Sequence, residues 1–135
     1  MVPTDSQPTR VLVVDDDEEF AATTAKKLAG RGFDAHAAFS GAEALAMLWR
    51  GAYDVAVVDL NMPGMDGIAV LRRTRDLASG LAVIVVTGFA SVSAGIEGMQ
   101  IGAADYLLKP VDIDRLSMSI EAAVEQDRTT RKKRD

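Results

Sequence analysis

The chain has 135 residues and carries 15 Lys and Arg against 20 Asp and Glu, a formal net charge of −5. This length fits one domain with a buried core, and the 48% share of apolar residues excludes an intrinsically disordered chain. Cysteine is absent, which excludes disulfides and thiolate metal sites, and neither a bilayer-spanning apolar run nor a secretory signal is recognisable. We therefore expect a cytoplasmic protein without a membrane partner.

The negative charge is concentrated in the body of the chain. Residues 128–135 hold five basic side chains and one acidic one, so the remainder has ten basic and 19 acidic side chains and a net charge of −9. Because phosphate contacts need clustered Lys and Arg, no direct nucleic-acid binding is expected of the acidic domain. Residues 1–9 are interpreted as an N-terminal extension, 10–126 as the domain, and 127–135 as a basic tail or the start of a linker, although such a tail could also contact DNA or a partner.

Short apolar or β-branched segments alternate with longer helical patterns along the chain. The predicted strands are residues 10–14, 33–38, 55–58, 81–86 and 105–108. The predicted helices are residues 17–31, 41–50, 67–77, 92–101 and 112–126. The strings VLVV, VAVV and LAVIVV are apolar at every position, which is typical of strands covered by helices on both faces. Strict β-α alternation with right-handed crossovers predicts a single α/β domain with a doubly wound parallel sheet.

Local signals mark the ends of two helices. Asp17 precedes two further acids and predicts a helix N-cap, and Ser40 with Glu43 three residues later predicts another. Gly30 and Gly32 predict the end of the first helix, because glycine tolerates the left-handed conformation on which helices often stop.

Polar side chains follow four of the five strands at the point where each strand ends. Asp15 and Asp16 follow the first strand, Asp59 the third, Thr87 the fourth and Lys109 the fifth. In doubly wound sheets, ligands bind outside the carboxyl ends of the strands, near the point where the strand order reverses. We therefore expect these five side chains to converge on one site.

The residue types at this site predict a phosphoryl-acceptor chemistry. Three carboxylates in one crevice raise each other's pKa unless a cation joins them, and ligands that are all oxygens favour Mg²⁺. A carboxylate beside the metal can attack phosphorus and form an aspartyl phosphate. Lys109 would supply a positive charge and Thr87 a hydroxyl donor for the phosphoryl oxygens.

Four sequence blocks carry a family resemblance: VLVVDDD, VVDLNMPGMDG, VIVVTGFAS and GAADYLLKP. Together they resemble the receiver domain of bacterial two-component response regulators, over about residues 9–126. The resemblance implies a flavodoxin-like fold, with a five-stranded parallel sheet in the order 2-1-3-4-5 and five helices.

The same resemblance implies the metal site. Asp59 would be the phosphoacceptor, and Asp16 and Asp59 would bind Mg²⁺ directly. Asp15 would hold the ion through water, and Asn61 would contribute its backbone carbonyl.

The resemblance also implies how the site responds. Lys109 would pair with the phosphoryl group, and its peptide bond to Pro110 would be cis. Thr87 would turn its hydroxyl onto the phosphoryl group, and Tyr106 would fill the vacated space as the aromatic switch residue.

The implied phosphoryl donor is a sensor histidine kinase or a histidine phosphotransfer protein. A homodimer through the face of the fourth helix, fifth strand and fifth helix, and an output domain beyond residue 135, are also compatible with the resemblance. The domain would not be an enzyme beyond promoting its own phosphorylation and dephosphorylation.

Two other functions stay open. A phosphatase of the haloacid-dehalogenase type also places a nucleophilic Asp after a strand. In that family the Asp belongs to a D-x-D pattern, whereas Asp59 is followed by Leu60 and Asn61, so the second acid is missing here. A receiver that acts as an unphosphorylated interaction module is the second alternative.

Overall fold

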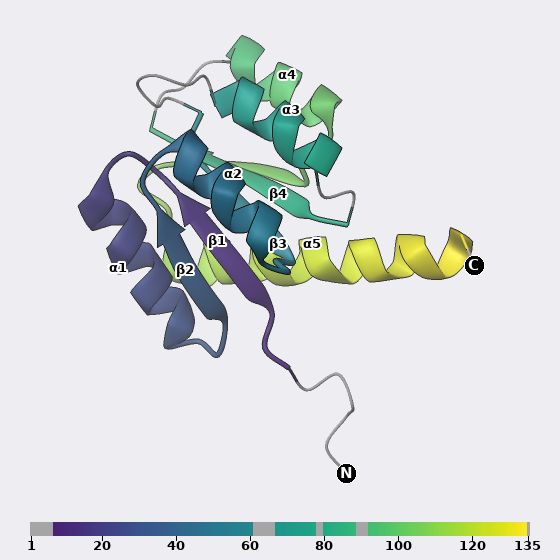
Figure 1. Cartoon of the computed structure of the whole chain (residues 1–135), viewed down its shortest axis with the longest axis horizontal. Helices are drawn as coiled ribbons and strands as arrows, with labels where there is room; N and C mark the ends of the chain where they lie inside the picture. The colour runs from purple at the N-terminus through teal and green to yellow at the C-terminus, as the bar shows by residue number, and fades with distance from the viewer. Residues whose placement is uncertain (1–6, 61–66, 78–79, 89–91, 135) are drawn as a thin grey trace.

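A computed structural model describes residues 7–60, 67–77, 80–88 and 92–134 of the chain. Its five strands form one parallel sheet in the order β2-β1-β3-β4-β5, with helices on both faces (Figure 1). The predicted flavodoxin-like, doubly wound α/β fold with five helices is thereby confirmed.

The element bounds lie close to those predicted from sequence. The strands are β1 Arg10–Val14, β2 Asp34–Ala38, β3 Val55–Val58, β4 Ala82–Thr87 and β5 Asp105–Leu108. The helices are α1 Glu18–Ala29, α2 Gly41–Arg50, α3 Gly67–Leu77, α4 Val92–Ile101 and α5 Ile113–Arg134.

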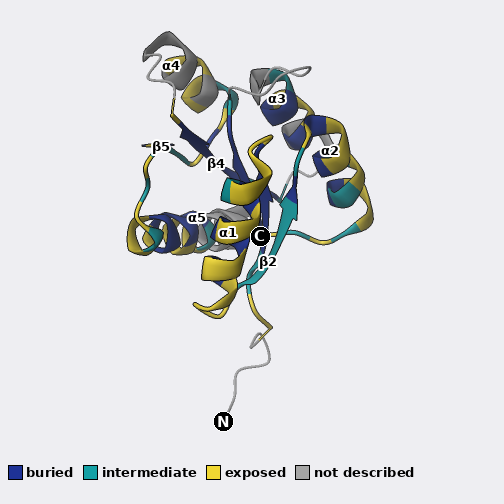
Figure 2. Ribbon diagram, turned by 90° about the vertical axis from the view of Figure 1, so that its left-hand side faces the viewer, coloured by how far each residue is buried: buried dark blue, intermediate teal, exposed yellow. Residues whose placement is uncertain are grey.

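Successive side chains along the strands point to opposite faces of the sheet, and each face has its own apolar core. Val11 and Val13 of β1 pack with α1 and α5, in what we call the α1–α5 core. Leu12 and Val14 pack with α2 and α3 on the opposite face, together with the end of α4, in what we call the α2–α4 core. Figure 2 shows β4 buried between the layers except at its first residue, whereas β2 at the sheet edge is mostly only partly covered.

The predicted helix caps are confirmed. The Asp17 side chain accepts a hydrogen bond from the Phe20 N–H at 3.0 Å, and the Ser40 side chain accepts one from the Glu43 N–H at 3.1 Å. Gly32 takes a φ of +95°, a left-handed conformation in which most side chains are strained. The next residue, Phe33, donates its N–H to the Leu28 carbonyl at 3.2 Å, which closes α1 with a Schellman motif.

The last helix is longer than predicted. The sequence prediction ended it at about Gln126, which was wrong because α5 continues to Arg134. Its last turns extend past the sheet (Figure 1). Lys and Arg are good helix formers, and cations are favourable near a helix C-terminus, so a basic sequence without Gly or Pro carries no stop signal.

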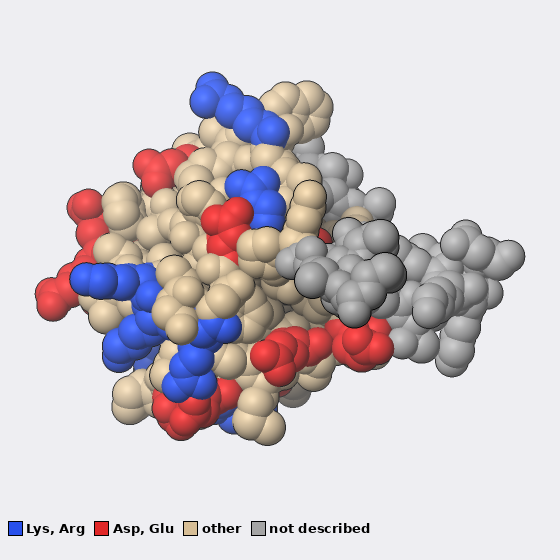
Figure 3. Space-filling model, turned by 90° about the horizontal axis from the view of Figure 1, so that it is seen from below, with Lys and Arg blue, Asp and Glu red and all other residues tan. Residues whose placement is uncertain are grey.

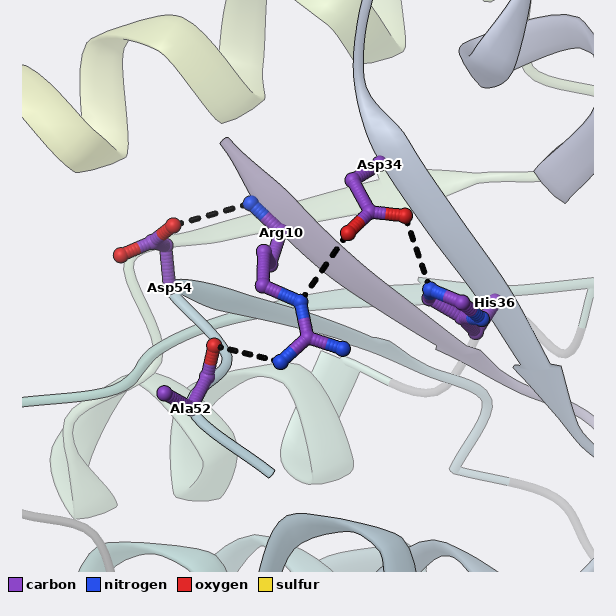
Figure 4. Close-up of polar contacts among 5 residues, drawn as sticks. All are labelled: Arg10, Asp34, His36, Ala52 and Asp54. Carbon is purple, nitrogen blue, oxygen red and sulfur yellow. Dashed lines mark hydrogen bonds and ion pairs between the residues drawn. The ribbon is translucent and has the colours of Figure 1, made fainter. Parts of the chain in front are cut away.

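A polar network joins the amino-terminal ends of the three neighbouring strands β2, β1 and β3 (Figure 4). The Arg10 side chain donates to Asp34 Oδ2 at 3.1 Å and to the Ala52 carbonyl at 3.2 Å, while its backbone N–H donates to Asp54 Oδ2 at 2.9 Å. His36 Nε2 lies 2.8 Å from Asp34 Oδ1. This network lies at the opposite end of the sheet from the acidic side chains that follow the strands.

The surface mixes charges of both signs. On the face seen in Figure 3, blue Lys and Arg side chains are interspersed with red Asp and Glu side chains. Within the described ranges, no helix is long and apolar enough to span a membrane.

Candidate phosphoryl-acceptor site

Two buried carboxylates lie side by side at the carboxyl edge of the sheet. Asp15 follows β1 and Asp59 follows β3, and these residues are only 1% and 6% exposed. The Asp15 N–H donates to the Ala38 carbonyl at 3.1 Å and the Asp59 N–H to the Val14 carbonyl at 3.0 Å. These hydrogen bonds extend the sheet ladder by one residue, so the sheet holds the backbone of both Asp15 and Asp59 in place.

A third carboxylate completes a cluster that could hold a metal ion. Asp16 is exposed, and carboxylate oxygens of Asp15, Asp16 and Asp59 all lie within 4.8 Å of one another. Such a set of hard oxygen ligands at the solvent edge suits a cation that keeps part of its water shell. Asn61, which was predicted to add a backbone carbonyl, lies outside the described residues.

Lys109 reaches this cluster from the end of β5. Its Nζ donates to Asp15 Oδ2 at 2.6 Å and lies 3.5 Å from Asp59 Oδ2. Its backbone N–H donates to the Thr87 carbonyl at 2.9 Å, and its peptide bond to Pro110 is cis. The sequence prediction that Asp15, Asp59 and Lys109 converge therefore agrees with the observed geometry.

The buried charges perturb each other. Burial raises the pKa of Asp15, and the nearby Asp59 raises it further, against the opposing hydrogen bonds from Lys109 and the Asp17 N–H. Burial acts to lower the pKa of Lys109, but the hydrogen bond and charge of Asp15, together with Asp59, outweigh burial and raise it. Lys109 therefore stays charged and compensates part of the acidic cluster.

The two predicted switch residues lie on the same face of the sheet. Thr87 ends β4 and is 1% exposed. Val83 and Val85 of the same strand pack in the α2–α4 core, so the alternation directs Thr87 to that side. Tyr106 pairs with Val85 in the sheet and packs, partly buried, against the same core.

A hollow of about 280 Å³ lies beside the acidic cluster, between α1 and the segment after β5. Asp17 and Phe20 are among the residues that line it on the side of α1, and Val111, Ile113 and Leu116 line the other side. The sequence patterns did not indicate this hollow, because it depends on how α1 packs against a segment 90 residues away.

Phe20 is a further residue that the sequence did not single out. Its ring centroid lies 4.1 Å from Lys109 Nζ, which is a cation–π contact. The only sequence signal was an aromatic residue one helical turn after the Asp17 cap, and that spacing alone is usually read as core packing.

Comparison with known proteins gives a consistent picture. The family model of the response regulator receiver domain matches residues 11–121. The chain is 38% identical over 120 residues to the transcriptional regulatory protein ZraR of Salmonella typhimurium. The match covers 89% of this chain but only 27% of that protein, so the chain spans about a quarter of the relative's length.

Solved structures agree with the sequence comparison. A CheY-like receiver domain protein from Methanospirillum hungatei has a TM-score of 0.87 at 28% identity, covering 91% of this chain and 98% of the other. A response regulator from Burkholderia pseudomallei has a TM-score of 0.80 at 27% identity, covering 91% of this chain and 72% of the other. That second protein was crystallised with a phosphorylated aspartic acid, a calcium ion and citrate.

Proposed function

Because this chain belongs to the response regulator receiver domain family, we propose that it accepts one phosphoryl group on Asp59 with the help of bound Mg²⁺. The observation that carries the proposal is the cluster of three carboxylates and one ammonium at the carboxyl edge of the sheet. We expect this activity of residues 10–126 in the cytoplasm, with 127–135 leading toward any further domain.

The charge of the cluster favours a divalent cation. Asp15, Asp16 and Asp59 carry three negative charges when ionised, and Lys109 compensates one of them. A divalent ion would bring the site to neutrality, whereas a monovalent ion would not. Mg²⁺ suits the oxygen ligands and completes its shell with water and phosphate oxygens. The Burkholderia relative, crystallised with a phosphorylated aspartic acid, supports the modification of an Asp in this fold.

The side chains have distinct roles in the proposed transfer. A carboxylate oxygen of Asp59 forms a bond to phosphorus while the P–N bond of a donor phosphohistidine breaks, and the imidazole leaves with the electron pair. When bound, Mg²⁺ would neutralise charge that develops on the phosphoryl oxygens. Asp16 and Asp59 would hold the ion directly, with Asn61 through its carbonyl and Asp15 through water. Lys109 would donate to a phosphoryl oxygen.

The proposed response of the fold is a shift between two packings of α4, β5 and α5. Thr87 would turn toward the new phosphoryl group, and Tyr106 would occupy the space that it leaves. These three elements expose large apolar side chains: Ile96, Met99, Leu108 and Met118. A homodimer through α4, β5 and α5 would cover exposed apolar surface of these elements.

The proposed donor is a sensor histidine kinase or a histidine phosphotransfer protein, and an output domain would follow residue 135. The relative ZraR, described as a transcriptional regulatory protein, extends well beyond the region that this chain matches. The receiver itself would catalyse only its own phosphorylation and dephosphorylation.

Phosphorylation by a small donor tests the proposal. The chain is incubated with Mg²⁺ and acetyl phosphate, and intact-mass spectrometry should show the addition of one phosphoryl group, located on Asp59 by peptide analysis. The Asp59→Asn variant should stay unmodified, and the control Asp54→Asn, altered at an exposed Asp in the opposite polar network, should react like wild type.

Two other outcomes would overturn the proposal. An unmodified wild-type chain, in the presence of Mg²⁺ at saturating acetyl phosphate, would favour the unphosphorylated interaction module. Steady, multiple-turnover release of phosphate from small phosphomonoesters would favour a phosphatase of the haloacid-dehalogenase type.

A further inference from the structure

Phe20 presents an aromatic ring to the ammonium group of the acidic cluster. It lies in the first turn of α1, where its backbone N–H donates to Asp17 Oδ1 at 3.0 Å. Its ring packs partly buried against the α1–α5 core and also borders the 280 Å³ hollow. The ring centroid lies 4.1 Å from Lys109 Nζ, well inside the distance at which a cation and a ring attract each other.

The ring replaces water that Lys109 has lost. The Lys109 side chain is only 21% exposed. Among the residues that the structure describes, its ammonium contacts Asp15 at 2.6 Å, Asp59 at 3.5 Å and the Phe20 ring. An aliphatic side chain in place of the ring would fill the same space but would leave that side of the ammonium without electrostatic compensation.

The two carboxylates that hold Lys109 are also the proposed metal ligands. A carboxylate that shares its charge with a divalent cation attracts a neighbouring ammonium less strongly. The ring has no part in binding the metal, so its attraction for the ammonium is unchanged by metal binding. Phe20 would therefore be a contact that persists when Lys109 is needed for the phosphoryl group.

We propose that Phe20 is a positioning residue, whose ring holds the Lys109 ammonium in place for phosphoryl transfer to Asp59. The inference rests on the function proposed above. It predicts that the electron density of the ring, and not only its size, sets the rate of Asp59 phosphorylation.

Aliphatic and aromatic replacements separate these two properties. The rate of phosphorylation by acetyl phosphate at saturating Mg²⁺ is measured by intact-mass spectrometry at timed intervals. A contact of this type corresponds to a loss of about 2- to 30-fold for Phe20→Leu, whereas Phe20→Tyr and Phe20→Trp should stay within about 2-fold of wild type.

Phe33→Leu is the matched control, because Phe33 packs partly buried against the same core and has no contact with Lys109. An equal loss in Phe20→Leu and Phe33→Leu would overturn the proposal, since it would assign the effect to core packing.

Fluorinated phenylalanines at position 20 keep the ring shape and progressively remove its negative face. The logarithm of the rate should fall steadily from phenylalanine to trifluorophenylalanine. A rate that is unchanged across this series would overturn the proposal even if Phe20→Leu fails to fold.

A measurement without phosphorylation separates this inference from the proposed function. In the unmodified protein, the ring current of Phe20 should shift the NMR signals of the Lys109 side-chain methylene protons upfield, and Phe20→Leu should abolish that shift. Absence of the shift would overturn the contact itself. A wild-type chain that shows the shift but accepts no phosphoryl group would instead overturn the proposed function.

Discussion

Removing the charge of Lys109 should destabilise the metal-free protein in a pH-dependent way. In Lys109→Met the stem of the side chain is retained, but two nearly buried carboxylates lose their shared cation. The pKa of Asp15 is already raised by burial and by Asp59, and loss of Lys109 raises it further. A carboxyl group with a raised folded-state pKa binds its proton more tightly when folded, so stability falls as the pH rises through that range.

The magnitude follows from the contacts. Removing one partner of a buried ion pair lowers the free energy of unfolding by about 3–5 kcal/mol. Because Lys109 is partly exposed, we expect a loss of roughly 2–4 kcal/mol at pH 7. This loss of stability has an upper limit, because Asp15 of the folded variant can bind a proton and thereby lose its uncompensated charge. From an ordinary pKa of about 3.9, that protonation costs about 4 kcal/mol at pH 7 but only about 1.5 kcal/mol at pH 5.

Urea denaturation in the presence of a chelator, at pH 5, 6, 7 and 8, measures this directly. We expect Lys109→Met to lose roughly 2–4 kcal/mol at pH 7, equivalent to roughly 7–14 °C in Tm, and at most about 1.5 kcal/mol at pH 5. Lys26→Met, at an exposed lysine of α1, serves as the control and should change stability by less than about 1 kcal/mol at every pH. A Lys109→Met variant as stable as wild type at pH 7, or one whose loss is the same at pH 5 and 8, would refute the electrostatic reasoning.

Three further experiments test the metal site, the end of α1 and the link between β5 and α5. Mg²⁺ at 100 times its Kd should add about 2.7 kcal/mol to the free energy of unfolding, roughly 9 °C in Tm, and Asp16→Asn should abolish most of this gain in a thermal scan. Gly32→Ala should cost about 1–2 kcal/mol in urea because its φ is +95°, whereas Gly30→Ala, at a φ of −64°, should not destabilise the protein. Ser119→Ala should cost about 1 kcal/mol because its Oγ donates to Asp105 at 2.7 Å. The buried Ser117 Oγ has no partner among the described residues, so Ser117→Ala should be neutral or stabilising, and equal losses in both serine variants would contradict this hydrogen-bond argument.

The strands and most helix bounds could be predicted because their signals are local. VLVV and VAVV are apolar at every position and end at an Asp, so the prediction placed β1 and β3 at the observed residues. The C-terminal end of α5 could not be predicted in the same way. Its basic residues are compatible both with a helix and with a solvated tail, and neither Gly nor Pro marks a boundary.

The convergence of the acidic site was predictable because parallel strands bring their carboxyl ends to one edge of the sheet. That rule needs only the order of the elements, and it placed Asp15, Asp59 and Lys109 together. The contact of Phe20 with Lys109 depends instead on the packing of α1 and on side-chain rotamers across 89 residues of sequence, for which no pattern exists. The same is true of the Arg10 network, whose partners come from β2 and from the segment before β3.

Strand alternation separates the chemistry of the site from its proposed output. Lys109 contacts Phe20, which packs against the α1–α5 core, whereas Thr87 and Tyr106 belong to the side of the α2–α4 core. A phosphoryl group held by both Lys109 and Thr87 would therefore engage both faces of the sheet at once. Because Tyr106 and Phe20 pack against different cores on opposite faces of the sheet, we expect a substitution at Tyr106 to alter the response of α4 and β5 while the rate of Asp59 phosphorylation stays near that of wild type. A substitution at Phe20 should lower the rate of Asp59 phosphorylation and leave the response of α4 and β5 unchanged. Comparing the two variants therefore tests directly whether phosphoryl transfer and response are separable in this fold.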